Sequence, residues 1–257
     1  MKTKYEIAKN WLPRYTGTPI DDFGDYLLLT NFHYYVEEFA NKFNTEVKGV
    51  GRPMQTATNS SGLTIVNFGI GSANAATIMD ILVARQPKGV LFLGKCGGLK
   101  RSTELGHFIL PTAAIRGEGT SNDYIAPEVP ALPSFKLHKF VSTSLVNRNL
   151  EYRTGVIYTT NRRLWEWDDN FKSYLQKIGA IGIDMETATL FIVGYVNQIP
   201  RGALLLVSDI PMFPEGVKTE ESDKKVNEQF VNLHLELGIE AMTDIGHKGE
   251  EIKHFTY

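Results

Sequence analysis

Acidic side chains at the ends of two expected strands are the residues in this sequence best placed to do chemistry. Asp184 and Glu186 flank Met185 where an apolar run gives way to a helical pattern, and Asp209 ends the run Ala203 to Asp209. An acid at a buried strand end is costly unless it is paired or used. Asp209 is therefore expected either to form a cap or salt bridge, or to be an acid whose pKa is raised by burial and which donates a proton.

Glu186 allows a similar pair of interpretations. At the start of a helix it could be a first-turn acid that faces the helix dipole. A carboxylate there can also accept hydrogen bonds from two neighbouring hydroxyls, which is the geometry of a ribose 2′,3′-diol.

Hydrophobic patterning predicts the elements that position these acids. Continuous apolar runs alternate with helical periodicity, which implies a largely parallel sheet covered on both faces. The expected strands are Tyr26–Thr30, Leu63–Gly71, Gly89–Gly98, His107–Gly117, Thr154–Thr160 and Ala203–Asp209. Helices are expected over 33–43, with Asn31 as N-cap, over 73–86 and over 226–242, where His234 is predicted to face solvent or a partner. We predict one α/β domain over residues 1–257, a three-layer α/β/α sandwich with a central mixed, largely parallel sheet.

Ligands of open α/β sheets collect at the carboxyl ends of the strands, and two of the expected strands end in glycine-rich segments. FGIGSANAAT includes Gly71, and GKCGGL includes Lys95, Cys96 and Gly97. Neither segment matches G-x-G-x-x-G or the Walker pattern. They are interpreted as tight turns or as backbone N–H cradles for an oxygen-rich ligand.

Composition excludes several classes of function. The net charge of −2 and the lack of a basic block argue against a nucleic-acid partner. No apolar run reaches the ~18 residues that span a bilayer, and the N-terminus lacks the apolar core of a secretory signal. The one cysteine, Cys96, permits neither an internal disulfide nor a multi-cysteine zinc site. A reduced, cytoplasmic enzyme or binding protein without metal or cofactor is expected.

Four motifs in order across Asn67 to Pro211 carry a family resemblance. They are NFGIGSANA, GKCGGL, IDMETAT and LLVSDIP, and the further segments YTGT, TNFHYYV and YTTNRRLWEW extend the match over nearly the whole chain. The sequence resembles the nucleoside phosphorylase/nucleosidase superfamily, and within it the AMP nucleosidases. The longer bacterial members carry an extra N-terminal regulatory region, which this chain is not expected to contain.

The resemblance implies roles for the acids. Glu186 would bind the ribose 2′- and 3′-hydroxyls while Met185 packs against the sugar, and Asp209 would protonate the purine at N7. The C1′–N9 bond would then break through an oxocarbenium-like state that Glu186 stabilises electrostatically. Asp184 is expected to be structural. The base-binding segment would supply Thr160, Asn161, Arg163 and Trp165, although Trp165 and Trp167 could equally be core residues.

The nucleophile separates the two branches of this superfamily. Phosphorylases hold phosphate with arginines, one of them just before the central glycine turn, and Phe92 stands near that position here. A dianion needs charge-assisted donors, so hydrolysis of AMP to adenine and ribose 5-phosphate is expected. A phosphate-dependent purine or uridine phosphorylase stays the alternative, because Lys95 or His33 could partly substitute. A nucleotide-binding protein without turnover is a third hypothesis.

The 5′-phosphate of AMP needs its own partners. The candidates are Arg52, Arg116, His33 and Tyr15, and either arginine could equally be a surface residue. Arg52 and the YTGT segment would act across a dimer contact, which implies a homo-oligomer with shared active sites, and relatives form dimers assembled into hexamers. The residue that positions the water stays open between His33, Asn31 and Glu118.

Overall fold

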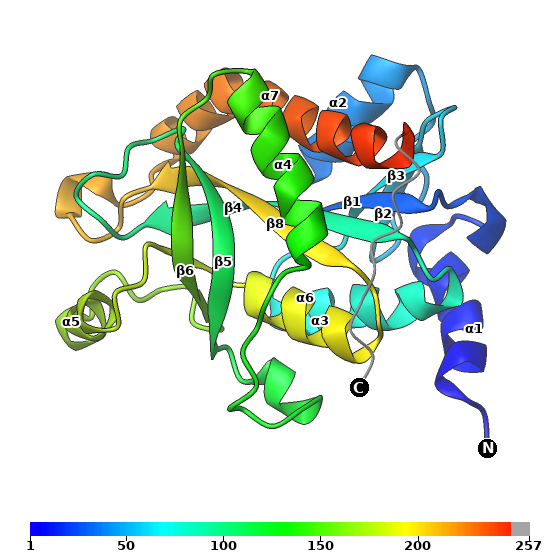
Figure 1. The fold of residues 1–257 in the computed structure, drawn as a ribbon, viewed down its shortest axis with the longest axis horizontal. Helices are drawn as coiled ribbons and strands as arrows, with labels where there is room; N and C mark the ends of the chain where they lie inside the picture. Colours follow the sequence, from blue (N-terminus) through cyan, green and yellow to red (C-terminus); the bar gives the residue numbers. More distant parts are fainter. Residues whose placement is uncertain (248–257) are drawn as a thin grey trace.

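The centre of the molecule is a mixed sheet of eight strands (Figure 1). The computed structural model describes residues 1–247. Its strands are β1 (Tyr26–Thr30), β2 (Gln55–Thr58), β3 (Leu63–Asn67), β4 (Gly89–Gly98), β5 (Phe108–Gly117), β6 (Tyr152–Thr160), β7 (Gly182–Asp184) and β8 (Arg201–Asp209). Their order is β2-β3-β1-β4-β7-β6-β5-β8. The six strands predicted by residue range are all present, and the short β7 is the apolar run expected to leave the sheet at Asp184. β2 is additional.

Parallel pairing dominates the sheet. β1 pairs in parallel with β3 and β4, β4 with β8, and β6 with β5 and β7, whereas β2–β3, β4–β7 and β5–β8 are antiparallel. The predicted fold class is therefore confirmed. One feature departs from a simple open sheet: β8 pairs with both β4 and β5, so β4, β7, β6, β5 and β8 close into a ring.

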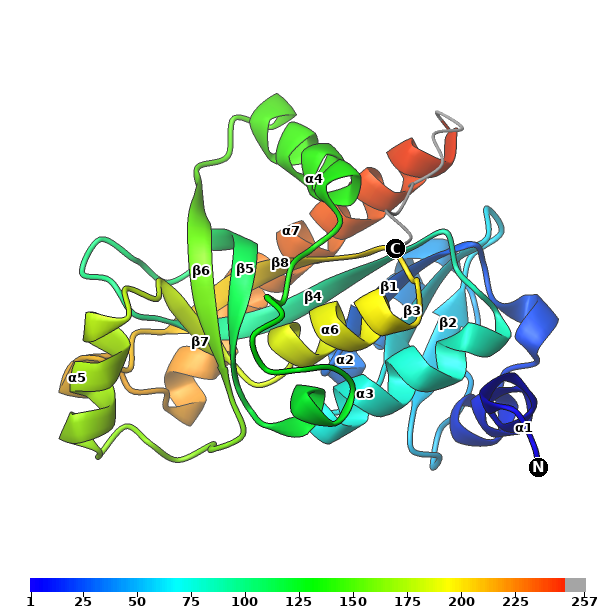
Figure 2. The same cartoon turned by 60° about the horizontal axis from the view of Figure 1, so that its bottom comes forward.

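Helices cover both faces of the sheet, as Figures 1 and 2 show. The helices are α1 (Lys4–Thr16), α2 (His33–Phe43), α3 (Ser72–Ile81), α4 (Phe135–Asn147), α5 (Asp169–Lys177), α6 (Thr187–Val196) and α7 (Glu220–His247). α2, α4 and α7 share one hydrophobic cluster, and α1, α3 and α6 share the other. Within β4, Leu91 and Leu93 belong to the first cluster and Val90 and Phe92 to the second, which explains why residues 90–93 of this strand are apolar without interruption. None of the helices within residues 1–247 has both the length and the apolar character that crossing a bilayer requires.

Two predictions about single residues are wrong. Phe32, not Asn31, is the N-cap of α2, and no side chain caps that helix; Asn31 is instead buried beside the pocket described below. His234 faces neither solvent nor a partner, because the side of α7 that carries it packs on the sheet. Its Nε2 lies 2.9 Å from the carbonyl oxygen of Leu204, which can only accept, so Nδ1 accepts from the Tyr35 hydroxyl at 2.8 Å. Burial lowers the pKa of His234 to about 3, which keeps the ring neutral.

Candidate active site

A pocket of about 260 Å³ lies where several strands of the closed ring end. Besides Asn31, a predicted candidate to position the water, nine of the predicted site residues line it: Lys95, Cys96, Gly97, Thr160, Arg163, Trp165, Met185, Glu186 and Asp209. The lining also includes Phe32, Ile70, Arg162, Glu166, Ile183, Asp184, Ser208, Lys218 and Asp223. Strands far apart in the sequence thus bring the two proposed functional acids, Glu186 and Asp209, into one cavity.

Glu186 is held rigidly at the start of α6. Its Oε1 accepts from the backbone N–H of Gly71 at 2.7 Å, and its Oε2 accepts from the N–H of Met185 at 3.2 Å. Gly71 adopts φ 98°, a conformation that side-chain-bearing residues rarely take, and so a glycine is needed to present this N–H. Burial, with the nearby charge of Asp184, raises the pKa of Glu186 to about 8, although hydrogen bonds from Gly71 and Asn31 favour its charged form.

The Asn31 amide adds an acceptor to this side of the pocket. Within the described part of the chain, its Oδ1 is buried and has no hydrogen-bond partner. An unmet acceptor in a buried site is costly, and a hydroxyl or water bound in the pocket would satisfy it.

Asp184 has the structural surroundings that the sequence analysis expects. Its Oδ2 accepts from the N–H of Thr187 at 2.8 Å and from that of Glu186 at 3.3 Å, and its Oδ1 accepts from the Thr159 hydroxyl at 2.7 Å. These bonds tie the start of α6 to β6. Burial raises the pKa of Asp184 despite them.

We expect Asp184→Ala to lower the free energy of unfolding by roughly 2 to 4 kcal/mol, because several buried donors lose their acceptor. Urea denaturation measures this change. The matched control is Asp169→Ala, at a carboxylate with a 94% exposed side chain, which should shift stability by no more than about 0.5 kcal/mol. Equal effects of the two substitutions would contradict the structural role of Asp184.

Asp209 ends β8 next to the central glycine turn. Its Oδ1 accepts from the Ser208 hydroxyl at 2.7 Å and lies 3.7 Å from Nζ of Lys218. A bulge between Cys96 and Gly97 pairs Gly97 with Asp209. A Cβ on Gly97 would lie 2.8 Å from the Pro211 ring, so the glycine allows β4 and the end of β8 to approach closely.

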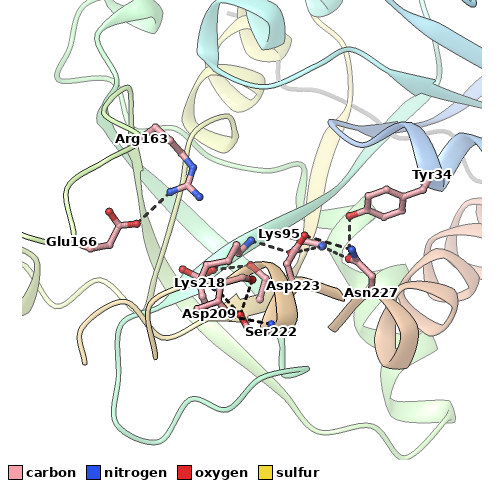
Figure 3. A network of polar contacts seen from close by, with 11 residues as sticks. Tyr34, Lys95, Arg163, Glu166, Asp209, Lys218, Ser222, Asp223 and Asn227 are labelled. Atoms are coloured by element: carbon pink, nitrogen blue, oxygen red, sulfur yellow. Dashed lines mark hydrogen bonds and ion pairs between the residues drawn. The ribbon is translucent and has the colours of Figure 1, made fainter. Parts of the chain in front are cut away.

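Lys95 belongs to an ion-pair network that Figure 3 shows around Asp209. Its side chain is only 2% exposed, and its Nζ lies 3.0 Å from Oδ1 of Asp223 on α7. It also donates to Oδ1 of Asn227, which accepts from the Tyr34 hydroxyl at 3.2 Å. Lys218 lies 3.4 Å from the same oxygen of Asp223. Burial lowers the pKa of Lys95, and the charge of Asp223 opposes that shift.

The loop after β6 forms the opposite wall. Trp165 is buried and packs edge-on against Phe171 at 5.4 Å between ring centroids, so it belongs to a small hydrophobic core as well as to the pocket. Trp167 is 76% exposed. Arg163 pairs with Glu166 at 3.3 Å (Figure 3). Asn161 is exposed and does not line the pocket.

The four residues predicted to bind the 5′-phosphate do not line this pocket of the described chain. The Arg116 guanidinium donates to Ser121, Asn122 and the carbonyls of Ile125, Ala126 and Val129, so it anchors the long loop after β5 instead of facing the pocket. Arg52 donates to the carbonyl of Arg14 at 3.0 Å at the end of α1. Tyr15 stacks on Trp11, and His33 packs edge-on against Tyr34.

Comparison with known proteins assigns the family. Residues 25–242 match the phosphorylase superfamily. A solved structure of AMP nucleosidase from Bacteroides thetaiotaomicron is 52% identical, with 96% of this chain and 100% of that chain covered and a TM-score of 0.86. AMP nucleosidase of Escherichia coli K12 is 27% identical over 98% of this chain, which spans 60% of that protein's length. Uridine phosphorylase from Vibrio fischeri ES114, at 24% identity and TM-score 0.78 over 88% of this chain and 94% of that chain, shares the fold. The chain therefore belongs to the phosphorylase superfamily and, within it, to the AMP nucleosidase family.

Proposed function

We propose that the protein is an N-glycosidase that hydrolyses AMP to adenine and ribose 5-phosphate. The observation that carries the proposal is the pocket itself, in which Glu186 and Asp209 line one cavity from the ends of different elements. The names of the two AMP nucleosidases, one of them 52% identical over almost the whole chain, support AMP as the substrate.

In the proposed reaction the two acids act on different halves of the nucleotide. Glu186 accepts hydrogen bonds from the ribose 2′- and 3′-hydroxyls, with Met185 against the sugar. Asp209 gives its proton to N7 of adenine, the C1′–N9 bond breaks, and the base leaves neutral while positive charge develops on the sugar. Glu186 stabilises that charge, and Lys218, 3.7 Å from Asp209, stabilises the carboxylate left by the proton transfer.

Water is the proposed nucleophile, because the cations of the pocket are already paired. Arg162 lies 2.7 Å from Asp168, Arg163 is paired with Glu166, and Lys95 is paired with Asp223. A phosphate dianion would have to compete for each of them. The unpartnered Oδ1 of Asn31 is our candidate to hold the attacking water. The water oxygen bonds to C1′, and the proton that the water loses returns through solvent to the Asp209 carboxylate.

The 5′-phosphate site and the assembly form a second part of the proposal. Arg52 and Tyr15 are the proposed ligands, supplied by a neighbouring subunit of a dimer-based homo-oligomer, for which a hexamer is the candidate assembly. Both residues lie together near the end of α1, since Arg52 donates to the carbonyl of Arg14 and the N–H of Met54 donates to the carbonyl of Tyr15.

Thr160 and Arg163 are the proposed contacts to the adenine base. A cytoplasmic location is also part of the proposal.

Product analysis by mass spectrometry tests the reaction. Nucleosides and 5′-nucleotides are incubated with the protein, with and without inorganic phosphate. Release of ribose 5-phosphate from AMP without phosphate supports hydrolysis. Strict dependence on phosphate would instead favour the phosphorylase alternative, and release of no base from any substrate would favour a binding protein.

A further inference from the structure

Two ammonium groups converge on a single carboxylate oxygen inside the pocket. Oδ1 of Asp223 lies 3.0 Å from Nζ of Lys95 and 3.4 Å from Nζ of Lys218, and all three residues line the cavity (Figure 3). Two charged donors around one oxygen are also the arrangement that binds a phosphate oxygen. The side chain of Asp223 is 36% exposed whereas that of Lys95 is 2% exposed, so the carboxylate is the solvent-accessible partner of a buried cation.

The three charges come from separate elements. Lys95 is on β4, Lys218 is on the segment between β8 and α7, and Asp223 is in the first turn of α7. One turn further along α7, Asn227 accepts from Lys95 as well, which fixes this turn against the end of β4. The carboxylate of Asp223 is therefore held at the two cations by the packing of a helix.

The paired cations lie beside the reacting part of the pocket. Lys218 is 3.7 Å from Asp209, the proposed acid for the base. A phosphate held by Lys95 and Lys218 would lie next to Asp209 and thus near the junction of base and sugar, where a nucleophile must stand.

We propose that Asp223 is an internal anion that occupies the place of an inorganic phosphate and thereby reserves the pocket for water as nucleophile. The inference rests on the proposed function and deepens it, because it assigns the choice of nucleophile to one residue outside the predicted catalytic pair. Removing the carboxylate would leave Lys95 and Lys218 without their shared partner and open a phosphate site.

The test is the binding of inorganic phosphate to Asp223→Asn, measured by isothermal titration calorimetry at constant ionic strength. The variant is expected to bind phosphate at least about tenfold more tightly than the wild type, a change of about 1.4 kcal/mol. Adding Lys218→Gln should abolish the gain. Glu221→Gln, which removes an exposed carboxylate from the same helical turn, is the matched control and should bind like the wild type. Unchanged phosphate affinity in Asp223→Asn would overturn the proposal.

Further measurements separate the remaining outcomes. Phosphate bound near C1′ should inhibit adenosine hydrolysis by the variant or divert it to ribose 1-phosphate, in which a phosphate oxygen bonds to C1′ as the C1′–N9 bond breaks. Phosphate that instead accelerates adenosine hydrolysis would be filling the 5′-phosphate position, which contradicts the proposal. Competitive inhibition by phosphate of adenosine hydrolysis by the wild type would also contradict it, even if Asp223→Asn did not fold, because phosphate in the 5′-phosphate position would not compete with adenosine. The binding measurement requires no turnover, so it stays decisive if the protein does not hydrolyse AMP.

Discussion

Asp209→Asn is expected to lower kcat for AMP by roughly a thousandfold, because removal of a general acid typically costs two to four orders of magnitude. The asparagine amide has nearly the same shape and can still hydrogen-bond to N7, but it cannot give up a proton to the leaving base. Binding of AMP should therefore change little, and the loss should be confined to the chemical step.

Steady-state kinetics and equilibrium binding of AMP to the same preparation measure these two effects separately. Asp169→Asn is the matched control, since it makes the same substitution at a carboxylate that is almost fully exposed on α5. A rate for Asp209→Asn close to that of the control would remove Asp209 from the mechanism. A loss of binding equal to the loss of rate would indicate a ground-state contact instead.

Glu186→Gln is expected to weaken binding of ribose 5-phosphate by roughly 10²-fold or more, because hydrogen bonds to a charged group contribute about 1.5 to 3 kcal/mol each and two are proposed. The pH dependence gives a second signature. The pKa of Glu186 in the free protein is raised to about 8, so the carboxylate is mostly protonated at pH 7 and ionises as the pH rises. Affinity for the diol should therefore rise about tenfold between pH 7 and pH 9.

Ribose 5-phosphate is the suitable probe because it lacks the base, which is the proposed partner of Asp209. Calorimetric titrations over this pH range would follow the wild type and Glu186→Gln in parallel. The affinity of Glu186→Gln should not rise with pH. The difference in affinity between the wild type and this variant should therefore be largest at pH 9. An affinity of the wild type that falls with pH would contradict the proposed grip on the diol.

Local sequence signals located the strand ends and therefore most of the pocket. The largely apolar runs that end in Gly98, Thr160 or Asp209 predict buried parallel strands, and their side chains converge because the ends of such strands share one edge. The place of the short β7 in the sheet and the closure of the sheet by β8 depend on pairings that no single segment encodes.

The errors in the sequence analysis have physical causes. Asn31 has the residue type of an N-cap, but the helix begins one residue later and the amide faces the pocket. The amphipathic pattern of α7 did not show how much of this helix the sheet buries, and so His234 was assigned to the surface. Arg116 meets loop carbonyls whose positions depend on how the segment after β5 folds back.

Lys218 and Asp223 were missed as pocket residues for a related reason. They lie on a polar segment and on the first turn of a helix, where charged residues are usually solvated. Lys95, the buried partner of Asp223, is 128 residues away from it in the sequence. A lysine inside an otherwise buried strand was the one available sign, because such a charge requires an anion from elsewhere in the fold.

The most direct test of the central claim is a crystal structure with a C-nucleotide analogue of AMP, in which a carbon–carbon bond joins base and sugar and resists hydrolysis. We predict that the carboxylate of Glu186 lies within hydrogen-bonding distance of both the 2′- and the 3′-hydroxyl, and that Asp209 faces N7 of the base. An analogue bound with its sugar away from Glu186, or with its base turned from Asp209, would contradict the account.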